Sequence, residues 1–206
     1  MAKPLEINEF NSKIKRYTSD VLFSESKTFH TVSPVLYTIF DCDDKTKLEF
    51  LETLNRITDL ANVQITEEKP VEEKIYTTLT VSTNFNEETE KQFKSLKLNF
   101  KERQSYSCTY GNKGLLMSAG ILLQPNQYTK EQREFEILKK ITYIFGFKGH
   151  TKLSEDSFFS KEGLKELSLL DKKLITFLYT NYKFLSSGYR VCHRTEFNKQ
   201  ATTKWK

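Results

Sequence analysis

The sequence predicts an α+β domain in which a mixed, mostly antiparallel sheet packs against two or three helices. The chain of 206 residues is long enough to bury a core without disulfides or metals. Short apolar stretches with strand-like patterning alternate along it with longer stretches of helical period. Residues 106–110 and 115–123 also flank a turn at 111–114, which predicts a hairpin. Together these observations indicate one domain with both kinds of element.

The first half of the chain predicts two helical segments and three strands. Residues 5–17 have apolar positions at near-helical spacing, which indicates a short helix or arm. A strand is expected at 35–40, followed by a helix in which Leu and Ile recur about every third residue over 48–60. Short strands are expected at 63–65 and at 75–81, where apolar and polar residues alternate.

The second half has clearer boundaries. Asn86 is a good cap for a polar helix with acids in its first turn. The strand at 115–123 is apolar on both faces, which predicts a central or covered position. Thr129 and Gln132 form a possible capping box at the start of a helix that runs to about residue 147, near Gly146. A final helix is expected at 168–182.

The charge pattern favours an ordinary solvated surface. The net charge is +5, and bases alternate with acids, as in residues 130–134. We expect an N-terminal arm over 1–16, a single domain over 17–190 and a basic tail over 191–206. Nucleic-acid binding stays an alternative, because the tail region carries Arg190, Arg194, Lys199, Lys204 and Lys206.

Compartment and redox state are left open by the sequence. The longest apolar stretch, 114–123, is about half of the roughly 20 residues that a membrane-spanning helix needs. The N-terminus lacks the apolar segment of a signal peptide, which fits either a cytoplasmic protein or one trimmed of its export signal. Cys42, Cys108 and Cys192 read as three thiols, or as one Cys108–Cys192 disulfide in an oxidising compartment.

No catalytic motif is present in the sequence. The three histidines, His30, His150 and His193, are not at the spacings that let one helix face present two imidazoles to a metal. HExxH, CxxC, GxSxG and a phosphate-binding glycine loop are all absent. The sequence therefore predicts no cofactor and no metal, and His150 reads as an exposed loop residue.

Several short segments, taken in order, resemble the bacterial family called domain of unknown function 2927. They are residues 157–159 (Ser-Phe-Phe), 167–171 (Leu-Ser-Leu-Leu-Asp) and 174–179 (Leu-Ile-Thr-Phe-Leu-Tyr). Upstream, residues 20–23 and the Pro-Val pair at 34–35 are similar to further blocks of that family. The resemblance covers most of residues 17–190 and implies a zincin-like fold, whose active-site helix carries HExxH in active metallopeptidases.

The resemblance also implies that the metal site is degenerate. Aligning the family's Gly-Leu with Gly146 and Phe147 sets Lys139 and Lys140 where zincins have the first ligand and the catalytic base, and Tyr143 at the second ligand. Ammonium groups have no lone pair for a metal ion. His150 falls one residue beyond the expected third ligand. Lys139 and Lys140 could be a solvated helix face, or, with Tyr143 and His150, bind an anionic or peptide group in a cleft against the 115–123 strand.

Three functions follow as hypotheses. The favoured one is a non-catalytic, pseudoenzyme-type binding or structural module that engages a protein or peptide partner in an exported or envelope assembly. An edge strand along such a cleft could pair with an extended peptide. The alternatives are nucleic-acid binding through the basic surface and a hydrolase with an unrecognised site.

Overall fold

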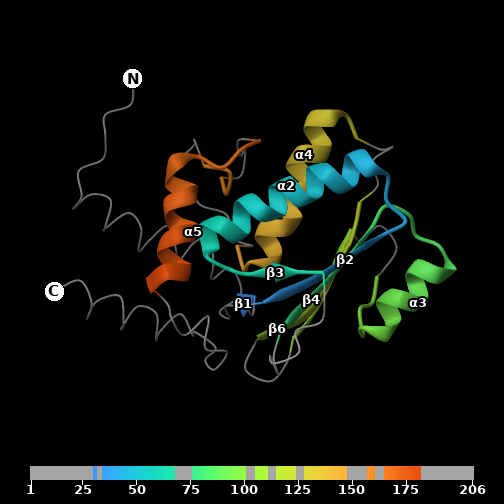
Figure 1. Ribbon diagram of the computed structural model, residues 1–206. Coiled ribbons are helices and arrows are strands. Elements are labelled where there is room, and N and C mark those ends of the chain that lie inside the picture. Colours follow the sequence, from blue (N-terminus) through green and yellow to red (C-terminus); the bar gives the residue numbers. More distant parts are fainter. Residues whose placement is uncertain are drawn as a thin grey trace, which may run out of the picture.

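The computed structural model describes residues 30–31, 34–67, 76–100, 105–110, 115–123, 128–147, 157–160 and 165–181. Four helices and six strands lie in these ranges (Figure 1). The strands are β1 (His30–Thr31), β2 (Val35–Phe40), β3 (Ile65–Thr66), β4 (Thr77–Ser82), β5 (Tyr106–Tyr110) and β6 (Leu115–Leu122). The helices are α2 (Asp44–Ala61), α3 (Glu87–Ser95), α4 (Lys130–Ile144) and α5 (Leu169–Asn181). The expected segment 5–17 lies outside the described residues.

The sheet is mostly parallel, which corrects the predicted fold class. Its strand order is β1-β6-β4-β2-β3, and β5 also pairs with β6. The β1–β6, β2–β3, β2–β4 and β4–β6 pairs are parallel, whereas β5–β6 is antiparallel. The expectation of an α+β, zincin-like domain with a mostly antiparallel sheet is therefore wrong. The described residues form an α/β fold in which strands alternate with helices.

The reason for this difference lies in the connections. A two-strand hairpin forces antiparallel pairing, and the predicted hairpin indeed joins β5 to β6. Between β2 and β3, however, the chain first runs through α2, which returns it to the same end of the sheet. Parallel pairing requires such a crossover. The hairpin that the sequence indicates therefore did not predict the direction of the other strand pairs.

The two faces of the sheet differ in chemistry, and the helices are distributed accordingly. Helices α2, α4 and α5 cover one face, and α3 lies on the other (Figure 1). The strand register gives the first face rows of largely apolar side chains, such as Ile39, Val81 and Ile121, which belong to or pack against the main core. The opposite face carries hydroxyl groups in matching rows. Its members include Thr38, Thr78, Thr80, Ser107, Thr109 and Ser118.

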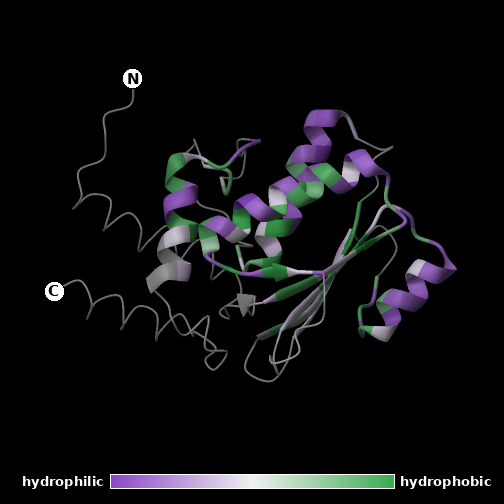
Figure 2. Cartoon of the chain, in the orientation of Figure 1, coloured by the Kyte–Doolittle hydropathy of each residue, from purple (hydrophilic) through white to green (hydrophobic). Residues whose placement is uncertain are grey.

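Helix α3 is held on the hydroxyl-rich face by a small aromatic cluster. Most of its side chains are hydrophilic (Figure 2), but Phe93 is buried. The Phe93 ring stacks on Phe100 with 4.4 Å between ring centroids and lies 6.0 Å from Phe40. Gly120 of β6 makes this contact possible, because a Cβ there would come within 3.0 Å of Leu98 and Phe100. Because glycine has no side chain, Leu98 and Phe100, which follow α3, can pack directly against β6.

The helix ends follow the capping signals in the sequence. The Asn86 side chain accepts from the Thr89 N–H, as predicted. The capping box at Thr129 is confirmed, since the Thr129 and Gln132 side chains each accept from the other residue's N–H. Gly146 has φ 91° just past the end of α4, a conformation that glycine adopts without a steric cost. These local signals fixed the start and end of α4 nearly correctly.

A buried carboxylate fixes the start of α5 to a preceding turn. Asp171 is fully buried, and its Oδ1 accepts from the Ser157 hydroxyl at 2.7 Å. Its Oδ2 accepts from the Phe158 N–H at 2.9 Å and from the N–H and hydroxyl of Ser168, both at 2.8 Å. The segments 157–159 and 167–171, which carry part of the family resemblance, are thus hydrogen-bonded to each other.

In the part of the chain that the structure describes, no helix combines the length and apolar character needed to cross a bilayer.

Candidate functional site

The predicted site residues of α4 lie on one face of the helix. Lys139, Lys140 and Tyr143 are separated by three or four positions from Glu136 or from each other, the spacing at which helical side chains are neighbours. We call Glu136, Lys139, Lys140 and Tyr143 the lysine cluster. The fourth predicted residue, His150, lies outside the described residues.

Glu136 joins the two lysines. Lys140 Nζ donates to Glu136 Oε2 at 2.8 Å, and Lys139 Nζ lies 3.8 Å from Glu136 Oε1. One carboxylate is therefore shared by two ammonium groups, which leaves one positive charge in excess. Lys139 also lies over the Phe135 ring, 5.8 Å from its centroid, close enough for a weak cation–π attraction.

The two lysines differ in their exposure to solvent. Lys140 is only 2 % exposed, whereas the Lys139 side chain is 36 % exposed. Burial lowers the pKa of Lys140, and its hydrogen bond to Glu136 opposes that effect. For Lys140, the alternative of a solvated helix face is therefore wrong. Lys140 can hold Glu136 in place, while Lys139 is the ammonium that a partner can reach.

Tyr143 connects the lysine cluster to the strand β5. Its ring meets that of Tyr106 edge-on, with 5.5 Å between centroids and 68° between the planes. Burial, and then the charge of Glu136, raises the pKa of Tyr143, so its hydroxyl is protonated at neutral pH. The cluster thus borders β5. The predicted cleft between α4 and the 115–123 strand is instead filled by buried core side chains, including Ile121, Ile137 and Ile141.

Sequence reasoning missed two residues of this site. Glu136 has a signal, because an acid three and four positions before two lysines on a helix predicts ion pairs. Tyr106 has none, since only the fold brings β5 next to α4. As arranged here, the cluster can attract one negative group and hydrogen-bond to it through Lys139, with tyrosine rings nearby.

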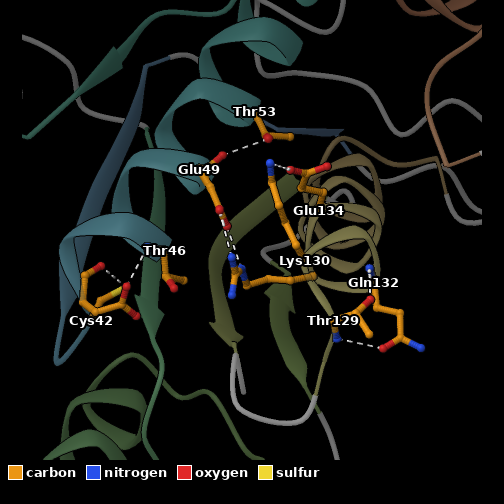
Figure 3. A network of polar contacts seen from close by, with 10 residues as sticks. Cys42, Thr46, Glu49, Thr53, Thr129, Lys130, Gln132 and Glu134 are labelled. Carbon is orange, nitrogen blue, oxygen red and sulfur yellow. Dashed lines mark hydrogen bonds and ion pairs between the residues drawn. The ribbon is translucent and has the colours of Figure 1, made fainter.

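A second polar feature joins α2 to α4 (Figure 3). Arg133 donates to both carboxylate oxygens of Glu49, at 2.6 and 2.9 Å, and both side chains are mostly buried. Beside this pair is a hollow of about 300 Å³, whose lining includes Glu52, Arg56 and Lys165. Among the described residues, four glutamates and only two basic residues line the hollow, so its charge is net negative and does not favour an anion.

The loop after β2 contains Cys42, whose thiol is protected from ionisation. Its burial, and next the charge of Asp43, raises the pKa of the Cys42 thiol to about 11. Thiolate is the reactive form, so at pH 8 only about a thousandth of Cys42 is nucleophilic. Cys108 is half-buried, and Cys192, its predicted disulfide partner, lies outside the described residues.

We expect Cys42 to react about a hundredfold more slowly with a thiol reagent at pH 8 than an unperturbed cysteine does. The measurement is the absorbance change with dithionitrobenzoate in a variant whose Cys108 and Cys192 are serine. Asp43→Asn keeps a residue able to cap α2 but removes the adjacent charge, so it should speed the reaction. A Cys42 rate equal to that of free cysteine would contradict the expectation.

Comparison with known proteins gives no match: no family model, no curated protein and no solved structure corresponds to the chain.

Proposed function

We propose that the chain is a non-catalytic binding module for a protein or peptide partner, and that the lysine cluster receives an acidic group of that partner. The observation that carries the proposal is that the two lysines differ in burial and in their distance to Glu136. Lys140 is buried against Glu136 and cannot reach a ligand, whereas Lys139 is partly exposed and only loosely paired with the same carboxylate. This arrangement supplies one fixed, accessible positive charge.

The chemistry of the cluster favours recognition over catalysis. Tyr143 is protonated at neutral pH, and the Lys140 ammonium is buried and already hydrogen-bonded. A nucleophile or general base needs an accessible lone pair, and neither side chain offers one. An accessible ammonium beside aromatic rings instead suits a carboxylate on a flexible peptide.

Binding of a fluorescein-labelled oligoglutamate peptide, followed by fluorescence anisotropy, tests the proposal. Lys139→Gln should weaken binding about three- to tenfold, because a charge-assisted hydrogen bond is lost. The matched control is Lys130→Gln on the same helix, which removes an exposed ammonium that is likewise paired with a glutamate four positions away. It should change the dissociation constant less than about twofold.

Two outcomes would contradict the proposal. Equal losses in the two variants would mean that the peptide senses only net charge. Stronger binding of a labelled oligonucleotide, with a steep loss of affinity between low and moderate salt, would favour the nucleic-acid alternative.

A further inference from the structure

We infer that Glu136 determines the specificity of the lysine cluster: it restricts the site to a single carboxylate and excludes a phosphate group. The inference rests on the proposed function, since it concerns the ligand of the same site. Glu136 thus acts in selection although its negative charge is opposite to the net positive charge of the cluster.

The geometry holds Glu136 inside the cluster. Its Oε2 accepts from Lys140 at 2.8 Å, and its Oε1 faces Lys139 at 3.8 Å. Lys140 is buried, so if Glu136 swung away it would leave an uncompensated buried ammonium, which is strongly unfavourable. Glu136 therefore stays in place when a ligand arrives.

The charge balance then sets what can bind. With Glu136 fixed, the two ammonium groups offer one unit of uncompensated positive charge. A carboxylate carries one negative charge and matches it. A phosphoryl group carries about 1.5 to 2 negative charges at pH 7. Its second charge would face the Glu136 carboxylate at short range, where the half-buried surroundings screen repulsion poorly.

The longer contact indicates where the ligand enters. Lys139 Nζ and Glu136 Oε1 form an ion pair, but the 3.8 Å between them is too long for a hydrogen bond. The Lys139 side chain is also 36 % exposed. A ligand carboxylate can accept from Lys139 without breaking the Lys140–Glu136 hydrogen bond. The nearby rings of Phe135 and Tyr143 leave an apolar border that suits the methylene groups of an acidic side chain.

Competition against the labelled oligoglutamate peptide tests the inference. The competitors are two short blocked peptides that are identical except for a central glutamate or phosphoserine. For the wild-type chain, the glutamate peptide should displace the probe at about fivefold lower concentration than the phosphoserine peptide. In Glu136→Gln, which keeps a carbonyl oxygen to accept from Lys140, the order should reverse. Glu134→Gln, an exposed acid on the same helix, is the matched control and should leave the order unchanged.

The possible results separate this inference from the proposed function. If oligoglutamate does not bind at all, the proposed function fails and the inference with it. If it binds through Lys139 but phosphoserine competes as well as glutamate in the wild type, the inference alone is overturned. The wild-type comparison decides the matter even if Glu136→Gln does not fold, which circular dichroism would reveal. An unchanged order in a folded Glu136→Gln would equally overturn it.

Discussion

Asp171→Ala is expected to lower the free energy of unfolding by about 3–5 kcal/mol. The carboxylate is fully buried and accepts four hydrogen bonds, from Ser157, the Phe158 N–H and two groups of Ser168. Alanine would leave these donors without their acceptor in a site that excludes water. Urea unfolding followed by circular dichroism gives the measurement.

Two further variants interpret the Asp171 result. Asp171→Asn retains one acceptor oxygen but turns the other into a donor, so we expect an intermediate loss. Asp59→Ala removes an exposed acid near the end of α2 and should change stability by less than about 0.5 kcal/mol. If Asp171→Ala were within about 1 kcal/mol of the wild type, the hydrogen bonds to the 157–159 turn would not stabilise the fold as argued.

Breaking the Glu49–Arg133 ion pair is expected to have the second largest effect. Arg133→Ala or Glu49→Ala should each cost about 2–4 kcal/mol, because truncating one partner leaves the other charge mostly buried and unpaired. The pair is bidentate and connects α2 to α4, with side-chain exposures of 13 % for Arg133 and 15 % for Glu49. Urea unfolding of both single variants and the double variant measures the coupling energy, which should be about 2–3 kcal/mol.

The same helix provides a control cycle for this coupling. Lys130 and Glu134 also form an ion pair (Figure 3), but at 3.7 Å and with side chains 65 % and 53 % exposed. Its coupling energy should be below about 0.5 kcal/mol, since water screens exposed charges. Similar coupling energies in the two cycles would contradict the argument that burial and bidentate geometry make the Glu49–Arg133 pair strong.

The candidate site was predictable only in part. Lys139, Lys140 and Tyr143 were proposed because the resemblance aligned α4 with a zincin helix, although the mostly parallel sheet is not that fold. Helical periodicity then sets them on one face. Periodicity could not tell which lysine is buried, because exposure depends on what packs against the helix. The neighbour Tyr106 is 37 positions away in the sequence, and it reaches Tyr143 only through the sheet.

By itself, the sequence determined the elements whose signals are local. Near-neighbour hydrogen bonds define the cap at Asn86 and the capping box at Thr129, and the left-handed conformation of Gly146 needs no distant partner. Apolar patterning likewise indicated that β6 is a central strand, and it lies between β4 and β5.

Only the tertiary structure decided the direction of the strands and which charged side chains are buried. Whether β2, β4 and β6 run parallel depends on how the connections cross the sheet, a long-range property that residue patterning in a single strand does not encode. The burial of Lys140 and Asp171 also depends on the tertiary structure. A charged side chain can be buried only where its partners, Glu136 for the lysine and Ser157 for the aspartate, are brought within hydrogen-bonding distance.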